Sequence, residues 1–120
     1  MKYILLIHNN MAAYDAMSED ERNALFGDVD RILNELKKSG EFVGGEGLAD
    51  SSQTKVVRVR NGVRTVTDGP FVEAKEQMGG YLIVDTETLD RAVDIAASWP
   101  DARYFAMEVR PIMQSAGDDV

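Results

Sequence analysis

The chain has 120 residues, of which 44% are hydrophobic and 28% charged, and its formal net charge is −8 at pH 7. This composition excludes a disordered protein and predicts one folded domain with its own core. The longest apolar run, residues 4–7, is too short to cross a bilayer, and no signal peptide is recognisable, so we expect no membrane partner. The absence of cysteine excludes disulfides and thiolate sites and favours a cytoplasmic location. The acidity argues against a nucleic-acid partner, because phosphate binding would have to overcome it.

The first strand and the first helix carry clear local signals. Residues 2–8 form an apolar, β-favouring run that predicts a buried strand. Ser18 and Glu21 have the spacing of a capping box at a helix start, and Gly40 follows the last turn as a C-terminal glycine does. The helix between them presents one apolar stripe at helical spacing, formed by Leu25, Val29, Ile32, Leu33 and Leu36.

The middle of the chain reads as three short strands. Residues 41–48 form a strand interrupted by glycines. Residues 55–60 and 63–67 are strands joined by Asn61-Gly62, a dipeptide that suits the positive φ angles of a type I′ turn. The sequence therefore predicts a β-hairpin at the centre of the chain.

The last third repeats the strand–helix–strand order. Residues 79–84 predict a strand, Thr86 is positioned to cap a second helix, and Pro100 ends that helix. Residues 104–110 form the last strand, and residues 114–120 read as a frayed, acidic tail. The predicted core face of the second helix consists of Leu89, Ala92, Val93, Ala96 and Ala97.

The element order is therefore β-α-β, hairpin, β-α-β, which predicts an α+β protein with a ferredoxin-like fold. In that fold both helices pack on one face of an antiparallel sheet. The other face needs a cover if it is apolar, and a second copy of the chain is the simplest one. We therefore expect a homodimer.

Residues 67–81 are the most informative segment, with the motif D-G-P-F followed by E-A-K-E-Q-M-G-G-Y. With the opening K-Y-I-L-L-I, the G-G-E-G-L and the late E-V-R-P, this segment resembles the YCII-related family, in particular its D-G-P-F members. The resemblance spans nearly the whole chain and assigns residues 1–113 to the domain and 114–120 to a disordered tail. It implies a ferredoxin-like subunit that pairs into a dimeric α/β barrel, with a pocket in each subunit.

The resemblance also implies differences. The better-studied branch of that family pairs a histidine on the first helix with an aspartate before a proline that follows the second helix. Here the first helix has no histidine, and Trp99 precedes Pro100, so that pair is absent. Because D-G-P-F members are often encoded beside alternative sigma factors, the resemblance also implies a sigma factor as a protein partner.

Two residues are candidate acid/base groups. His8, the only histidine, titrates near neutral pH and can donate or accept a proton, or it is simply bonded at a strand end. Asp68 supplies a carboxylate for the same chemistry, or it shapes the Asp-Gly-Pro turn.

Four further residues are candidate substrate-binding groups. Glu46 lies between two glycines, where an acid can face a cavity or a β-bulge can form. Phe71 can stack on a ligand or plug a gap, Glu73 lies beside the turn, and Lys75 can meet a substrate carboxylate or form a solvated ion pair. With no nucleotide-binding glycine motif and one histidine, the sequence predicts no cofactor and no metal site.

Two functions follow as hypotheses. The first is a small-molecule-binding protein, with enzyme chemistry of lyase, isomerase or dehalogenase type on a small carboxylate or lactone. The alternative is a non-catalytic sensor or interaction module associated with sigma-factor-dependent transcription. Fold analogy alone does not choose between them.

Overall fold

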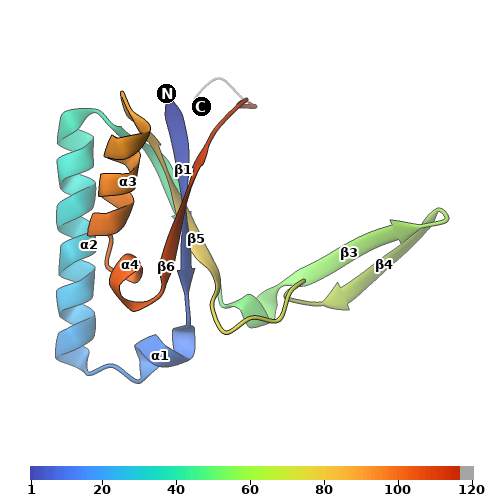
Figure 1. Cartoon of the computed structure of the whole chain (residues 1–120). Coiled ribbons are helices and arrows are strands. Elements are labelled where there is room, and N and C mark those ends of the chain that lie inside the picture. Colours follow the sequence, from blue (N-terminus) through green and yellow to red (C-terminus); the bar gives the residue numbers. More distant parts are fainter. Residues whose placement is uncertain (117–120) are drawn as a thin grey trace.

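The computed structural model describes residues 1–116 and contains a four-stranded antiparallel sheet with all of its main helices on one face (Figure 1). The sheet consists of β1 (Lys2–Asn9), β2 (Phe42–Gly47), β5 (Gln77–Asp85) and β6 (Ala106–Pro111). Their spatial order is β2-β5-β1-β6, and every neighbouring pair is antiparallel. This order confirms the α+β, ferredoxin-like prediction.

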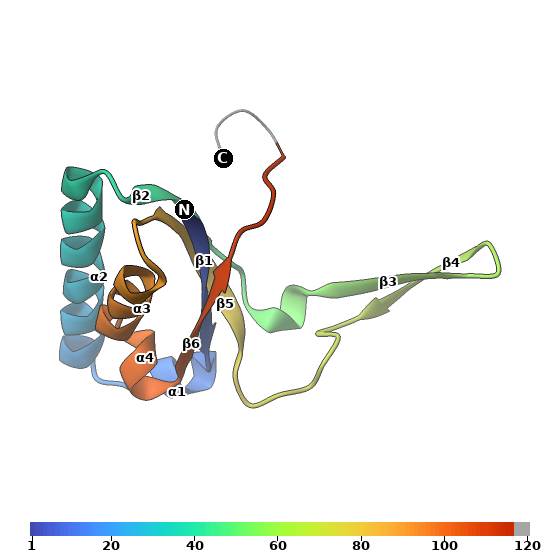
Figure 2. The ribbon, with the colours of Figure 1, turned by 45° about the horizontal axis from the view of Figure 1, so that its top comes forward.

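The helices are α1 (Met11–Asp15), α2 (Glu19–Ser39), α3 (Leu89–Ser98) and α4 (Asp101–Tyr104). Helices α2 and α3 lie side by side on one face of the sheet in both ribbon views (Figures 1 and 2). Between them and the sheet lies the core, to which β1 contributes Tyr3 and Leu5, and β5 contributes Leu82 and Val84. No helix among residues 1–116 is long and apolar enough to cross a membrane.

The capping signals of α2 are confirmed. The Ser18 hydroxyl accepts a hydrogen bond from the Glu21 amide at 3.1 Å, and the Glu21 side chain accepts one from the Ser18 amide. Gly40 ends the helix with φ 81°, a left-handed conformation that glycine adopts without steric cost. The apolar stripe also faces the core, since Leu25, Ile32 and Leu36 are buried.

Two details of α3 differ from the prediction. The helix is capped by Thr88, whose hydroxyl accepts from the Arg91 amide at 3.1 Å, whereas Thr86 is buried and donates to the Thr88 carbonyl. The core face contains Ala92, Ile95 and Ala96, while Leu89 and Val93 remain about half exposed. The helix starts two residues later than the Thr86 cap implied, and Ile95 rather than Val93 faces the sheet.

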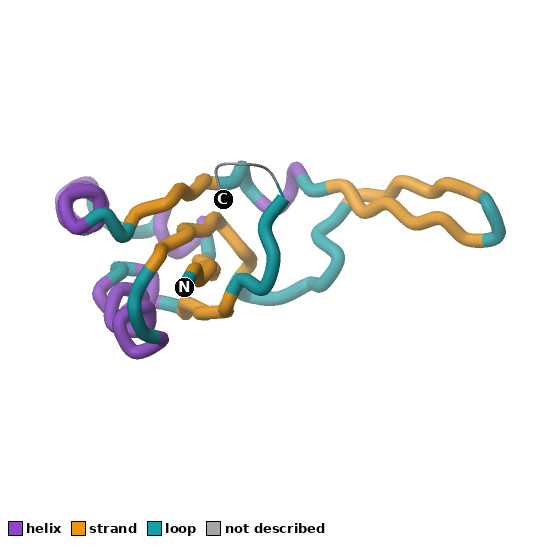
Figure 3. The backbone as a smooth tube through the Cα atoms, turned by 90° about the horizontal axis from the view of Figure 1, so that it is seen from above, coloured by secondary structure: helices purple, strands orange, loops and turns teal. Residues whose placement is uncertain are grey.

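The hairpin is a separate element that projects from the sheet on the side away from the helices (Figures 1 and 3). Strands β3 (Lys55–Arg60) and β4 (Val63–Asp68) pair only with each other among the described residues. The turn residues Asn61 and Gly62 have φ 52° and 75°, as a type I′ turn requires. We call residues 55–68 the arm. The short 3₁₀ turn η1 (Ser51–Gln53) lies at its base.

The end of the chain is described only in part. Residues 112–116 form no helix or strand, and residues 117–120 of the predicted tail lie outside the described residues.

Candidate functional site

Two cavities lie at the end of the sheet where β1 runs into α1. The first has a volume of about 430 Å³ and a wall of mixed polar and apolar groups, and the second has a volume of about 490 Å³ and a largely apolar wall. Asn9, Met11 and Gly79 line both cavities, which therefore meet at the end of β1. We call them the polar cavity and the apolar cavity.

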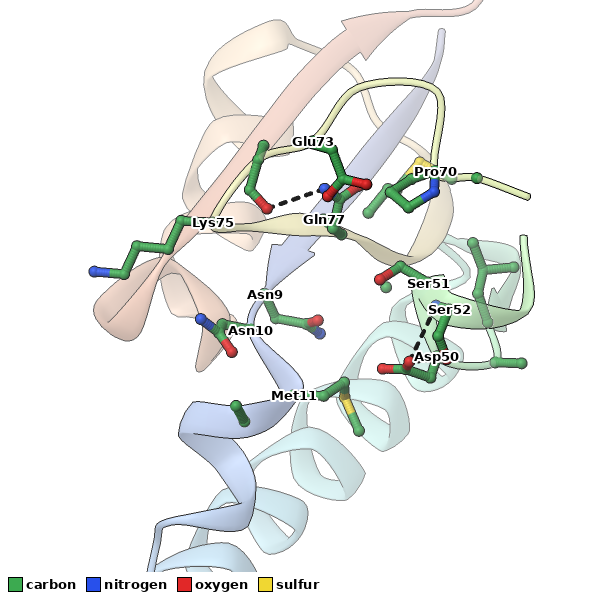
Figure 4. Close-up of a pocket in the computed structure, with 17 residues that line it drawn as sticks. Asn9, Asn10, Met11, Asp50, Ser51, Ser52, Pro70, Glu73, Lys75 and Gln77 are labelled. Carbon is green, nitrogen blue, oxygen red and sulfur yellow. Dashed lines mark hydrogen bonds between the residues drawn. The ribbon is translucent and has the colours of Figure 1, made fainter. Parts of the chain in front are cut away.

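The polar cavity lies between α1, the segment around η1 and the loop before β5 (Figure 4). Gln77 shapes that loop, because its side-chain amide donates to the carbonyls of Val72 and Ala74 at 3.0 Å each. On the opposite wall, the hydrogen bond from Ser52 to the Asp50 carboxylate lowers the pKa of Asp50. The polar side chains that line the whole cavity are Asn9, Asn10, Asp50, Ser51, Ser52, Glu73, Lys75 and Gln77.

The apolar cavity lies between the sheet, α1 and the first half of α2. Its apolar wall is formed by Ile7, Leu25, Phe26, Val29, Leu33, Phe42, Leu82 and Trp99. A cavity of this size and lining is typical of small-molecule sites, in which a few polar groups fix the orientation of the ligand.

A buried carboxylate is one of the polar groups of the apolar cavity, which Arg22 and Asp15 also line. Asp101 is only 5% exposed, yet it lines the cavity. It accepts a hydrogen bond from the Tyr14 hydroxyl and a longer one, 3.4 Å, from the Asn9 side-chain amide. A carboxylate has about four acceptor positions, so Asp101 retains capacity for a ligand donor.

Tyr14 is held as a proton donor. Burial raises the pKa of the Tyr14 hydroxyl far above its ordinary value, and the hydrogen bond to Asp101 and the charge of that carboxylate raise it further. Tyr14 therefore stays protonated at neutral pH. Its ring packs edge-on against Phe105, with ring centroids 5.3 Å apart.

The loop around Tyr14 is fixed by Arg22 of α2. Its guanidinium Nη1 donates to the backbone carbonyls of Tyr14 and Asp15 at 3.3 Å and of Met17 at 2.6 Å. At the start of α1, the Asn10 side chain accepts from the Ala13 amide at 3.3 Å. These contacts hold α1, and with it Tyr14, against α2.

A family comparison agrees with this fold: the model of the YCII-related domain matches residues 1–116. The chain belongs to the YCII-related family. An uncharacterized protein of Rhizobium meliloti (strain 1021) is 29% identical over 114 residues, which cover 93% of this chain and 92% of the relative.

Within this YCII-related domain, the two predicted acid/base residues lie apart from both cavities' walls. His8 Nε2 lies 2.5 Å from the Glu108 carboxylate. His8 is thus a hydrogen-bonded histidine near the end of β1. Asp68 is highly exposed at the base of the arm, and its carboxylate lies 2.5 Å from Lys55 Nζ. Their role in acid/base chemistry stays a prediction.

The predicted binding residues divide between the two cavities. Glu73 and Lys75 line the polar cavity, and the backbone segment of Glu46 lines the apolar one, while strand alternation turns the Glu46 side chain to the other face of the sheet. Phe71 lines neither cavity; it is 71% exposed, with the Arg58 guanidinium 5.1 Å from its ring centroid. The β-bulge considered at Glu46 lies earlier in the strand, where the register shifts between Phe42 and Gly44.

Sequence reasoning missed Tyr14, Asp101 and Asn9. Helix α1 has only five residues and none of them is buried, so it leaves no apolar periodicity to detect. Asp101 follows Pro100 directly, and an acid beside a helix-ending proline is usually a surface residue. A tyrosine and an asparagine just after a buried strand were the available signal, since residues at strand ends often line binding sites.

A metal ion is bound by several ligating side chains that lie close together. Among residues 1–116, no group of three or more histidine, cysteine, aspartate or glutamate side chains is arranged to hold a metal ion.

Proposed function

We propose that this YCII-related protein binds a small molecule that has an apolar body, a hydrogen-bond donor and a carboxylate or lactone group. The buried carboxylate of Asp101, at a largely apolar wall, is the observation that carries the proposal. A buried charge is costly to maintain, and such groups concentrate at functional sites.

Each part of the ligand has a complementary region. The apolar body fits the apolar cavity, and its donor meets the free acceptor positions of Asp101. The acidic end points into the polar cavity, where the amides of Asn9 and Asn10 offer donors. Lys75 also lines this cavity; its side chain points outward in Figure 4 and supplies a positive charge by turning inward, which offsets the carboxylates of Asp50 and Glu73. A carboxylate placed beside Asp101 would instead be repelled.

The same geometry supports proton transfer. Asp101 can accept a proton from a bound ligand, while the protonated Tyr14 holds the carboxylate in place. Turnover of lyase, isomerase or dehalogenase type would therefore use Asp101 as the base. His8 and Asp68 line neither cavity, so they would take part in such a reaction only from outside the two cavities.

We also propose two assignments on which the site does not depend. One is membership in the D-G-P-F subgroup, supported by Asp68-Gly69-Pro70-Phe71, of which Gly69 and Pro70 line the polar cavity. The other is a homodimer formed through the uncovered sheet face, where Ile4, Leu6, Tyr81 and Ile83 are only partly buried. The association with a sigma factor and the cytoplasmic location remain predictions from the sequence.

The test is a thermal-shift and calorimetric screen with small aromatic and aliphatic hydroxy acids, their lactones and their methyl esters. A ligand at a hundred times its Kd stabilises the fold by about 2.7 kcal/mol, which is a shift of several degrees. We expect D101N to weaken the bound compound at least tenfold, because the amide offers fewer acceptor positions. Asp30→Asn makes the same change at an exposed carboxylate of α2 that lines neither cavity, and it serves as the control.

A substitution at Lys75 tests the acidic end of the ligand separately from its apolar body. We expect Lys75→Met to weaken the acid and leave its methyl ester unchanged, because only the acid gains from the ammonium group. Affinities that are unaffected by D101N, or a screen in which no compound shifts the melting temperature, would overturn the proposed site.

A further inference from the structure

We propose that the arm is an exchanged element: in the homodimer proposed above, the arm of each copy packs on the uncovered sheet face of the other. The inference rests on that homodimer but assigns the arm a role that the homodimer alone does not require.

The arm has an apolar face with nothing packed on it in the single chain. Val57, Val59 and Val66 lie on one side of the hairpin, since Val57 is directly opposite Val66 and Val59 is two residues further along. Their exposed fractions are 60%, 59% and 45%. An isolated two-stranded hairpin is marginally stable in water, so this face needs a surface to pack against.

The chain's shape shows how much surface is left uncovered. The accessible surface is 8209 Å², whereas a compact monomer of 13.3 kDa exposes about 6,500 Å². The excess of about 1,700 Å² is larger than the roughly 800 Å² that each partner buries in a standard interface. Consistently, the radius of gyration is 16.4 Å, against about 14 Å for a compact domain of this length.

Charge identifies a second copy as the occupant. Four basic residues (Lys55, Arg58, Arg60 and Arg64) and one acid (Asp68) give the arm a net charge of +3. Because the whole chain carries −8, the rest of the chain carries −11. The arm of one copy is therefore electrostatically complementary to the body of another.

The register defines the surface that receives the arm. Glu46, Tyr81, Leu6 and Glu108 form one cross-strand row over all four strands, and the next row contains Ile83, Ile4 and Arg110. The row between these two consists of Leu5, Leu82 and Val109, which pack towards the helices. Because side chains alternate along a strand, the rows on either side of it face the uncovered side of the sheet. This face has a partly buried apolar centre that suits the valine face of the arm. The exposed acids Glu46 and Glu108 lie at its two edges and can meet the arginines of the arm, and Arg110 lies next to Glu108 on the same edge strand.

The first test is the mass of the protein in solution, measured by analytical ultracentrifugation over a range of micromolar concentrations. We expect a dimer of the full chain and at least a tenfold higher dimer Kd for Val66→Asp. Val93→Asp is the matched control, because Val93 on α3 is 46% exposed and Val66 is 45% exposed. Its dimer Kd should equal that of the unmodified chain.

The second test removes the arm. The Gly69 amide donates to the Thr54 carbonyl at 2.8 Å, so the two ends of the arm are adjacent and an Asn-Gly turn can replace residues 55–68. We expect a folded monomer with unchanged helical circular dichroism. A folded arm-less protein that dimerises with unchanged Kd would overturn the exchange and leave the homodimer standing.

A monomeric full chain would overturn both proposals. If that monomer retarded a labelled oligonucleotide or bound a sigma factor, the basic arm would belong to that other partner. Binding of small molecules in the two cavities is measured separately and does not depend on either outcome.

Discussion

The body and the arm are built from the same kinds of residues and are stabilised in different ways. In the body, Leu5 and Val84 are completely buried between the sheet and the helices. In the arm, valines with the same strand preference remain about half exposed, and the hairpin is defined by the Asn61-Gly62 turn and its own strand pairing. Local turn chemistry is therefore enough to specify a hairpin's shape, whereas burial specifies the position of an element within the fold.

The largest expected difference is in the effect of truncating an apolar side chain. Leu5→Ala should lower the free energy of unfolding by about 3–5 kcal/mol, because it leaves a cavity in the core. Val57→Ala, measured by urea unfolding at concentrations where the chain is monomeric, should change it by no more than about 0.5 kcal/mol. Similar losses for the two variants would contradict the distinction between body and arm.

A smaller effect is expected where two strands of the body approach closely. A Cβ atom added at Gly80 would lie 2.7 Å from the backbone oxygen of Glu46, so Gly80→Ala must separate β5 from β2. We expect a loss of about 1–3 kcal/mol, visible as a melting temperature lowered by several degrees. Gly44→Ala, in the same pair of strands, meets nothing within 4 Å and is the control. Equal melting temperatures would show that β2 can move without cost.

The smallest effect concerns an ion pair that joins α3 to Glu41, the residue before β2. Arg91 donates to both oxygens of Glu41, at 2.9 and 2.8 Å, and this hydrogen bonding lowers the pKa of Glu41. A lowered pKa stabilises the fold above the ordinary glutamate value of about 4.3, and the contribution is lost as the pH falls through the folded-state value.

Arg91→Met should therefore lower the free energy of unfolding at pH 7 and make little difference at pH 2, as measured by urea unfolding. Arg31→Met removes an exposed pair with Glu35 on α2 and should cost less at pH 7. A penalty for Arg91→Met that is the same at both pH values would exclude the ion pair as its cause.

The elements that could be predicted from sequence are those with local signals. Ser18 with Glu21, Gly40, and Asn61-Gly62 each fix a backbone conformation through their own chemistry, and the structure has all of them. The strand and helix order then restricted the topology to the ferredoxin-like arrangement. The α3 boundary failed because Thr86 and Thr88 are equally good caps in sequence, and only the packing of Thr86 under the helix distinguishes them.

The candidate site was mostly invisible because it depends on long-range contacts. Tyr14 and Asp101 are 87 residues apart, and neither belongs to a motif. Asp68 and Phe71, within a recognisable motif, drew attention to the base of the arm, where both side chains are exposed. The resemblance predicted the right fold. It drew attention to the residue before Pro100, however, whereas the buried carboxylate is Asp101, which follows Pro100, and its contact with Tyr14 is visible only in the folded structure.

The three hydrogen bonds from Arg22 to backbone carbonyls attach a wall of the apolar cavity to the core. They fasten α1, which has no buried residue of its own, to α2, whose inner face is part of the core. The apolar cavity is thus closed on one side by a short segment that hydrogen bonds of Arg22 and Tyr14 hold in place, and on the other side by the sheet. A sequence change at Met11, which lines both cavities, can therefore reshape them without altering the core.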